Sequence, residues 1–162
     1  MATQPSDSSS RAVKNYRMHE GDVSIPAAWQ DQSMQMFRIS GPPSSNDASF
    51  IVTRDYNAGS LEPTAYAQAQ QATLKQRFVD FRLVTQTENV VSGTRAAVLD
   101  YLWTANGITL RQRQAHVPAS ECMVILTMTA RQADFEQHES AWLEVLQSLR
   151  LRDGTGWDEG KR

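Results

Sequence analysis

The stretch that decides the fold runs from Arg95 to Thr129 and reads RAAVLDYLWTANGITLRQRQAHVPASECMVILTMT. Two runs of alternating apolar and polar residues flank the pair Asn106-Gly107, and this arrangement is the strongest short-range signal for a β-hairpin. A third apolar run, Glu121–Thr129, follows the hairpin and predicts another strand. The stretch therefore predicts an antiparallel sheet built around one hairpin.

A two-residue turn at Asn106-Gly107 fixes which residues face each other across this hairpin. It pairs Ala105 with Ile108, Trp103 with Leu110, Tyr101 with Gln112, Leu99 with Gln114 and Asp100 with Arg113. Side chains alternate strictly between the two faces, so a slip of one residue would invert the pattern. Because both faces carry apolar residues, we expect helices of the chain to cover one face and a partner to use the other. We interpret the Asp100–Arg113 pair as a cross-strand ion pair rather than a catalytic pair.

Together with these three strands, the whole chain is predicted to form eight strands and two helices in the order ββββαββββα. The expected strands are Tyr16–Glu20, Asp22–Ile25, Ser33–Ser40, Ser49–Asp55, Phe81–Glu88, Arg95–Thr104, Ile108–Val117 and Glu121–Thr129. The first helix starts near Pro63, with apolar residues at helical spacing, namely Ala67, Leu74, Phe78 and Phe81. The second follows Asp134, which forms a capping-box pattern with Gln137, and Leu149–Arg152 leaves it as a short strand. This order predicts an α+β fold, an antiparallel β-sheet with two helices packed on one face.

The length of 162 residues suits one domain with a core of its own. Residues 1–14 are polar and rich in serine, which predicts a disordered N-terminal leader. Residues 15–152 are expected to form the single α+β domain. Residues 153–162 combine glycines and charges and are expected to form a flexible C-terminal tail.

Charge and cysteine content narrow the class of protein. The net charge of −2 gives no general affinity for nucleic acid or for an anionic membrane. No apolar segment follows Met1, and no window reaches the ~20 apolar residues of a membrane span. The one cysteine, Cys122, falls within an apolar run and is expected to be a packing residue, so no disulfide forms within the chain. These features predict a cytoplasmic protein.

The sequence shows none of the patterns that mark an active site. His19, His116 and His138 fall in three separate elements, and none has a second ligand at metal-binding spacing. There is no GxSxG motif and no glycine-rich phosphate loop. We therefore expect no enzymatic activity, no metal and no cofactor. A small hydrolase or isomerase would need a convergent polar constellation that the sequence does not show.

The strands instead carry a surplus of apolar and amide side chains suited to binding. Methionine adapts its shape to varied apolar partners, and glutamine offers both a donor and an acceptor. The expected binding residues are Val23, Ile25, Met34 and Met36 as apolar contacts, with Gln112 and Gln114 as polar contacts. Two alternatives stay open: the four apolar residues could be core, and Gln112 could be a core amide if helices pack on its face. In the second case the binding groove lies on the side of Leu102 and Arg111.

Several segments together resemble the DcrB-related family, and within it the effector-associated (Eag) chaperones of type VI secretion. The similar segments are Tyr16–Pro26, Trp29–Phe37, Arg54-Asp55, Tyr101–Trp103, Leu110–Gln114, Leu126–Thr129 and Ser148–Arg152. The resemblance covers about Tyr16–Arg152 and rests on the order and spacing of strand patterns rather than on one signature.

The resemblance implies a Mog1/PsbP-like fold, with a curved antiparallel sheet backed by helices, in a homodimer. It also implies a chaperone that binds the N-terminal transmembrane helices of a cognate type VI effector. Such a chaperone shields those helices from water before the effector is loaded, with its spike-tip protein, onto the secretion spike. The alternative is a Mog1/PsbP-like binding module for a different protein partner.

Overall fold

The structure is a computed structural model that describes residues 12–40, 48–58 and 60–152. Within it the chain forms two compact units, Met1–Gln32 and Ser33–Arg162. Most of the predicted leader and all of the predicted tail lie outside the described residues, although Val13 and Lys14 belong to a strand. The single domain over residues 15–152 stays a prediction.

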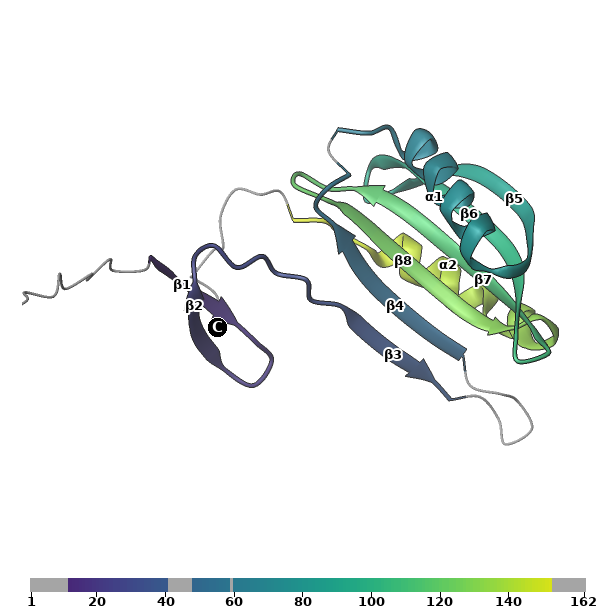
Figure 1. The fold of residues 1–162 in the computed structure, drawn as a ribbon, viewed down its shortest axis with the longest axis horizontal. Coiled ribbons are helices and arrows are strands. Elements are labelled where there is room, and N and C mark those ends of the chain that lie inside the picture. Colours follow the sequence, from purple (N-terminus) through teal and green to yellow (C-terminus); the bar gives the residue numbers. More distant parts are fainter. Residues whose placement is uncertain (1–11, 41–47, 59, 153–162) are drawn as a thin grey trace, which may run out of the picture. The chain divides into compact units, whose positions relative to one another are not determined.

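The elements follow the predicted order, with one short 3-10 helix added before the second α-helix (Figure 1). They are β1 (Val13–Arg17), β2 (Asp22–Pro26), β3 (Gln35–Ile39), β4 (Ala48–Asp55), α1 (Pro63–Arg77), β5 (Val79–Val91), β6 (Thr94–Ala105), β7 (Ile108–Pro118), β8 (Met123–Arg131), η1 (Gln132–His138) and α2 (Glu139–Ser148). The predicted α+β class and the antiparallel pairing of the strands are confirmed.

The first unit is a two-stranded antiparallel hairpin of β1 and β2. Tyr16 lies opposite Val23, and Lys14 lies opposite Ile25. An ion pair of 3.2 Å between Arg17 Nε and Asp22 Oδ1 closes the turn end. Every described residue of this unit is exposed or half-buried, so the hairpin has no core of its own. Isolated hairpins of this kind are at best marginally stable in water.

The second unit is built on a six-stranded antiparallel sheet with the order β3-β4-β8-β7-β6-β5. The β6–β7 hairpin has the predicted register, with Ala105 opposite Ile108 and Tyr101 opposite Gln112. Asn106 and Gly107 have φ angles of 50° and 74°. Two successive positive φ angles are what a type I′ turn requires, and this turn matches the twist of the flanking strands.

The two helices pack on opposite faces of this sheet, so the prediction of both on one face is wrong. Ala67 and Leu74 of α1 pack with Leu99 of β6, whereas Trp142 of α2 packs with Val98. Neighbouring strand residues point to opposite faces. Figure 1 shows α1 in front of the sheet and α2 behind it. Both faces of β6 are apolar, so each face needs its own helix; we call these faces the α1 side and the α2 side.

The ends of the helices show where local sequence patterns succeed and fail. Helix α1 begins at Pro63 as predicted. Helix α2 begins only at Glu139 and has no side-chain cap, because the expected capping residue Asp134 lies within η1. The predicted strand after α2 is not formed: the Leu151 backbone N–H donates to Ser92 Oγ at 2.8 Å instead of to a strand ladder.

On the α2 side, the predicted ion pair is confirmed and belongs to a larger cluster. Asp100 is only 2% exposed and accepts hydrogen bonds of 2.8 Å from both Arg111 and Arg113. Arg113 also donates to Glu139 at 2.6 Å, and both guanidinium groups lie over the ring of Phe135. Burial alone would raise the pKa of Asp100, but the two arginines outweigh burial and lower it. The cluster joins β6, β7, η1 and α2.

Candidate protein-binding surface

The α1 side of the sheet is only partly covered by its helix. Helix α1 packs against β5, β6 and β7, and Figure 1 shows β4 and β3 running beside it uncovered. We call the α1-side residues of β3, β4 and β8, together with two glutamines of the neighbouring β7, the open strip. It consists of Met36 and Arg38 from β3, Ser49 and Ile51 from β4, Thr127 and Thr129 from β8, and Gln112 and Gln114 from β7.

Strand register arranges the side chains of the open strip in rows that cross the sheet, because residues directly opposite each other share a face. The first row runs Met36, Ile51, Thr127 and Gln114. The second row runs Arg38, Ser49, Thr129 and Gln112. Each row begins at the β3 edge and ends with a glutamine beside α1. The first row is half apolar, and the second is polar throughout.

Besides Nδ1 of His116, three buried polar atoms on the α1 side have no hydrogen-bond partner among the described residues. They are the carbonyl Oε1 of Gln112, the indole Nε1 of Trp103 and the hydroxyl of Tyr101. Tyr101 lies directly opposite Gln112, and Trp103 lies one pair further towards the turn. A buried group left unsatisfied costs about 1–3 kcal/mol. This part of the α1 side therefore holds one hydrogen-bond acceptor and two groups that can donate, none with a partner among the described residues.

The structure brings some of the predicted binding residues together and separates others. Met36 is 64% exposed on the open strip, and Met34 is 58% exposed just before β3, so neither is a core residue. Gln112 and Gln114 are half-buried on the same face as Met36. Val23 and Ile25 lie on one face of β2 in the hairpin unit, where Val23 is exposed and Ile25 half-buried.

Sequence reasoning missed the middle of the open strip. Ser49, Ile51, Thr127 and Thr129 supply its floor. The alternation of Ser49 and Ile51 in one run, and of Thr127 and Thr129 in another, was visible in the sequence. What the sequence did not reveal is that β4 pairs with β8, so that Ile51 lies opposite Thr127, 76 positions later in the chain.

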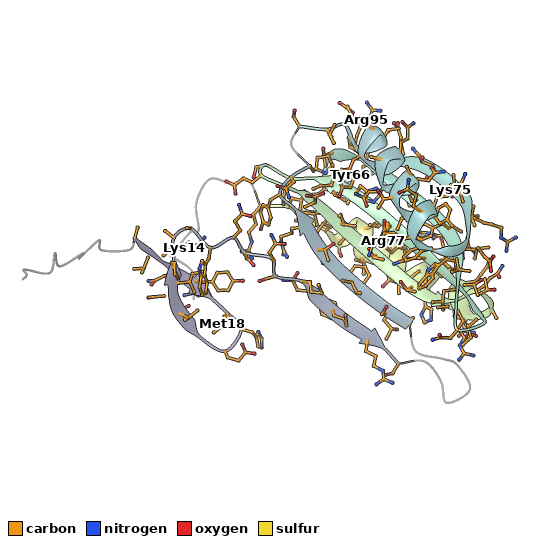
Figure 2. All side chains as sticks on the ribbon, viewed as in Figure 1. Lys14, Met18, Tyr66, Lys75, Arg77 and Arg95 are labelled. Atoms are coloured by element: carbon orange, nitrogen blue, oxygen red, sulfur yellow. The ribbon has the colours of Figure 1, made fainter. Side chains whose placement is uncertain are left out.

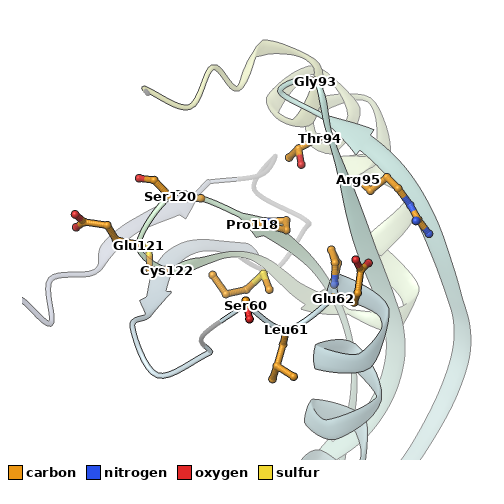
Figure 3. Close-up of a pocket in the computed structure, with 13 residues that line it drawn as sticks. Ser60, Leu61, Glu62, Gly93, Thr94, Arg95, Pro118, Ser120, Glu121 and Cys122 are labelled. Atoms are coloured by element: carbon orange, nitrogen blue, oxygen red, sulfur yellow. The ribbon is translucent and has the colours of Figure 1, made fainter. Parts of the chain in front are cut away.

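Beyond the open strip, at the end of the sheet where α1 begins, three turns surround a pocket (Figure 3). Its walls are 60–63, 93–95 and 118–123. Cys122 lies here, half-buried and outside the strand in which it was expected, and burial raises the pKa of its thiol. A thiol with a raised pKa is a poor nucleophile. The pocket therefore offers no reactive cysteine.

Near this end, His116 is fully buried against the edge of the Tyr66 ring, and burial lowers its pKa to about 4. The Tyr66 hydroxyl donates to Asp55 at 2.8 Å (Tyr66 is labelled in Figure 2). Burial is also the main cause that raises the pKa of Tyr66. Across the described residues, no group of three His, Cys, Asp or Glu side chains is placed to hold a metal ion. In the same part of the chain, no helix has the length and apolar character needed to cross a membrane.

The fold and this surface define an α+β protein with one sheet face left partly open. Comparisons then give the family: a model described as DcrB matches residues 20–148. The protein named Effector EagT6, from Pseudomonas aeruginosa, is 34% identical over 134 residues, which are 83% of this chain and 93% of that protein. The chain belongs to the DcrB family, and the resemblance seen in the sequence is confirmed.

Two solved structures are also similar. The crystal structure of PA94 from Pseudomonas aeruginosa, described as a protein of unknown function and putative regulator, has a TM-score of 0.76 and 33% identity. The similarity covers 86% of this chain and 97% of that one. The PsbP protein CyanoP from Synechocystis has a TM-score of 0.47 and 10% identity over 88% of this chain and 94% of that one, which is too weak to support an argument.

Proposed function

We propose that this protein is a cytoplasmic chaperone for a type VI secretion effector. It binds and shields the N-terminal transmembrane helices of that effector and helps to load the effector, with its spike-tip protein, onto the secretion spike. The protein acts as a homodimer and uses no cofactor. Membership of the DcrB family and the identity with Effector EagT6 support an effector partner.

The observation that carries the proposal is the open strip beside α1. An apolar helix outside a membrane aggregates unless its surface is covered, because burial of apolar area drives association. The strip offers apolar contact through Met36 and Ile51, and α1 lies beside it on the same face of the sheet (Figure 1). This arrangement suits helix-in-groove recognition.

The unpaired polar atoms of the α1 side support the same proposal. Helices that pack in membranes associate through small residues and through interhelical hydrogen bonds from serine, threonine and amide side chains. Gln112, whose Oε1 lacks a partner among the described residues, can accept such a hydrogen bond. Gln114 offers a second amide in the neighbouring row. The chaperone thus supplies contacts that the client helix makes later with other helices.

The proposed binding set contains four apolar residues: Met36 in the open strip, Met34 just before β3, and Val23 and Ile25 in the hairpin unit. Val23 and Met36 are both exposed, which leaves them available to a client. None of the four is required for a core.

Co-expression tests the proposal directly. The protein is produced with the N-terminal segment of a candidate effector encoded by a neighbouring gene, and the pair is analysed by affinity pull-down and by size exclusion with light scattering. We expect a stable complex in which the segment is soluble only when this protein is present. A segment that stays insoluble in both cases contradicts the proposal and favours a different protein partner.

A matched pair of variants locates the binding face. Met36 is 64% exposed on β3, and Val79 is 65% exposed on β5 at the opposite edge of the sheet. We expect Met36→Asp to weaken the complex at least ~10-fold while leaving the melting temperature unchanged, because it places a charge against an apolar helix. Val79→Asp should leave binding unchanged. Equal binding by the two variants would show that the open strip is not the site.

A further inference from the structure

Charged side chains are unevenly placed along the α1 side of the sheet. At the end where α1 stops, four basic residues gather: Lys75 and Arg77 in the last turn of α1, Arg38 in β3 and Arg131 at the end of β8. Asp80, an acidic residue, follows α1 near the start of β5. We call this the basic end of the open strip.

Strand register shows that these residues lie at one end. Arg38 is opposite Ser49, which is opposite Thr129, two residues before Arg131. Arg131 is opposite Leu110, and Leu110 is opposite Trp103. The Trp103 ring stacks on Phe78, the residue that follows Arg77, at 4.3 Å between ring centroids. Two neighbouring rows, one through Arg38 and one through Arg131, therefore link β3 to the last turn of α1.

The opposite end of the α1 side carries acidic residues. Glu62 and Glu121 are exposed and line the pocket at the start of α1, and Figure 3 shows both there. Asp55 lies near them at the end of β4. The cation in this pocket, Arg95, is paired with Glu88 at 2.8 Å. The α1 side is therefore polarised from acidic, where α1 begins, to basic, where α1 ends.

A second depression lies at the basic end and has both apolar and polar residues in its lining. Met36 and Leu110 give its apolar lining, and Ser49 and Thr129 give hydroxyl groups. Arg38 and Arg131 stand at its rim. Arg131 is exposed and has no ion-pair partner among the described residues.

These charges favour one direction for a bound helix. A helix carries partial positive charge at its N-terminus and partial negative charge at its C-terminus, where the last four carbonyl groups lack intrahelical partners. We propose that the client helix lies along the open strip with its C-terminal end over Arg38 and Arg131, and that an acidic residue directly after that helix completes the contact. Its N-terminal end then points towards Glu62 and Glu121, so it runs in the same direction as α1. This inference rests on the proposed function and adds the direction and flanking charge of the client.

Two synthetic peptides test the direction. Both contain the same 20-residue apolar helix of leucine, alanine and serine; one carries lysines before it and glutamates after it, and the other carries the charges reversed. Affinities are measured by fluorescence anisotropy at low ionic strength, where such charges are least screened. We expect the peptide with lysines first to bind roughly 3- to 30-fold more tightly, as expected from favourable charge at both helix ends.

Charge-reversal variants identify the residues responsible. The double variant Arg38→Glu/Arg131→Glu should abolish or invert the preference between the two peptides, and the milder Arg131→Gln should reduce it. A matched control, Arg82→Glu/Arg150→Glu, changes net charge equally at exposed positions, with Arg82 opposite Leu102 on the α2 side. The control should keep the original preference. Melting curves confirm that each variant is folded.

The outcomes separate this inference from the proposed function. Equal affinity for both peptides contradicts the proposed direction of the client helix but agrees with helix binding. Tighter binding of the reversed peptide also contradicts the direction and agrees with helix binding. Binding of neither peptide overturns the proposed function itself. A third peptide, with the same glutamates on a glycine- and proline-rich chain, should bind at least ~10-fold more weakly; comparable binding would mean that the basic end recognises acidic segments without a helix.

Discussion

The two faces of the central sheet use the same strands in different ways. On the α2 side, charged residues of the chain pair with one another: Asp100, Arg111 and Arg113 form one cluster with Glu139. On the α1 side, Gln112 and Tyr101 lie opposite each other with buried polar atoms that no described residue satisfies. The buried charge of the α2 side is paired within the chain, whereas the α1 side keeps neighbouring buried polar atoms that have no partner among the described residues.

The difference between the two faces follows from the cost of burying a polar group without a partner. A buried charge must be paired within the fold, because an unpaired one costs several kcal/mol. A neutral amide costs less to leave unsatisfied, about 1–3 kcal/mol. The chain therefore pairs the buried charge of Asp100, and leaves buried neutral side chains without a partner among the described residues on the face proposed to bind the client.

The largest expected effect on stability comes from replacing Asp100. Asp100→Ala leaves Arg111 and Arg113 facing each other with only glutamates of η1 and α2 as counter-charges. We expect the free energy of unfolding to fall by about 3–5 kcal/mol, as for other buried pairs that lose one partner. Chemical denaturation measures this loss.

Glu136→Ala is the control for that experiment. Glu136 is 88% exposed and only 3.8 Å from Arg111, and exposed pairs of this kind contribute ~0–1 kcal/mol. A similar loss of stability in both variants would show that the α2-side cluster is not the element that holds this face together.

The next effect is a dependence of stability on pH that comes from the α1 side. Burial lowers the pKa of His116 to about 4, below the ordinary value of 6.5, so the folded state binds fewer protons than the unfolded state in this window. The stability contribution of neutral His116 is fully present above pH 6.5 and is lost as pH falls towards 4. The total loss is of order 3 kcal/mol.

A His116→Gln variant isolates this contribution. Denaturation at pH 7.5 and at pH 4.5 should show a smaller pH-dependent loss for the variant than for the unchanged chain. The buried neighbour Tyr66 stays neutral throughout this range, because the ordinary tyrosine pKa of 10.0 already lies above it and burial raises the pKa of Tyr66 further. An identical pH dependence in the two proteins would assign the loss to carboxylates elsewhere.

The sequence predicts the local parts of this structure well. The Asn106-Gly107 turn, the register of β6 and β7, the start of α1 at Pro63 and the Asp100–Arg113 pair all follow from residues close together in the chain. Alternation on one hairpin also reveals that both faces are apolar. It does not reveal that each face receives its own helix, because that depends on contacts between distant elements.

For the candidate binding surface too, the sequence does not predict contacts between distant strands. Met36 and the two glutamines were found by residue type, and the structure places them on one face. Their connection runs through Ile51 and Thr127, residues of β4 and β8 that meet only because these distant strands pair. Helix α2 begins later than its capping-box pattern indicated, since tertiary packing outweighs a local cap worth about 1 kcal/mol.

The smallest effect on stability, and the sharpest test of the comparison, comes from Gln112→Leu. This change removes a buried acceptor that no described residue satisfies and puts an apolar side chain of similar size in its place. We expect the free energy of unfolding to change by less than ~1 kcal/mol, or to rise, because no hydrogen bond of the free chain is lost. Binding of the client helix should weaken ~10-fold, because its polar contact is lost. A large loss of stability, measured by denaturation, would mean that Gln112 serves the fold, and the contrast between the two faces would then be incorrect.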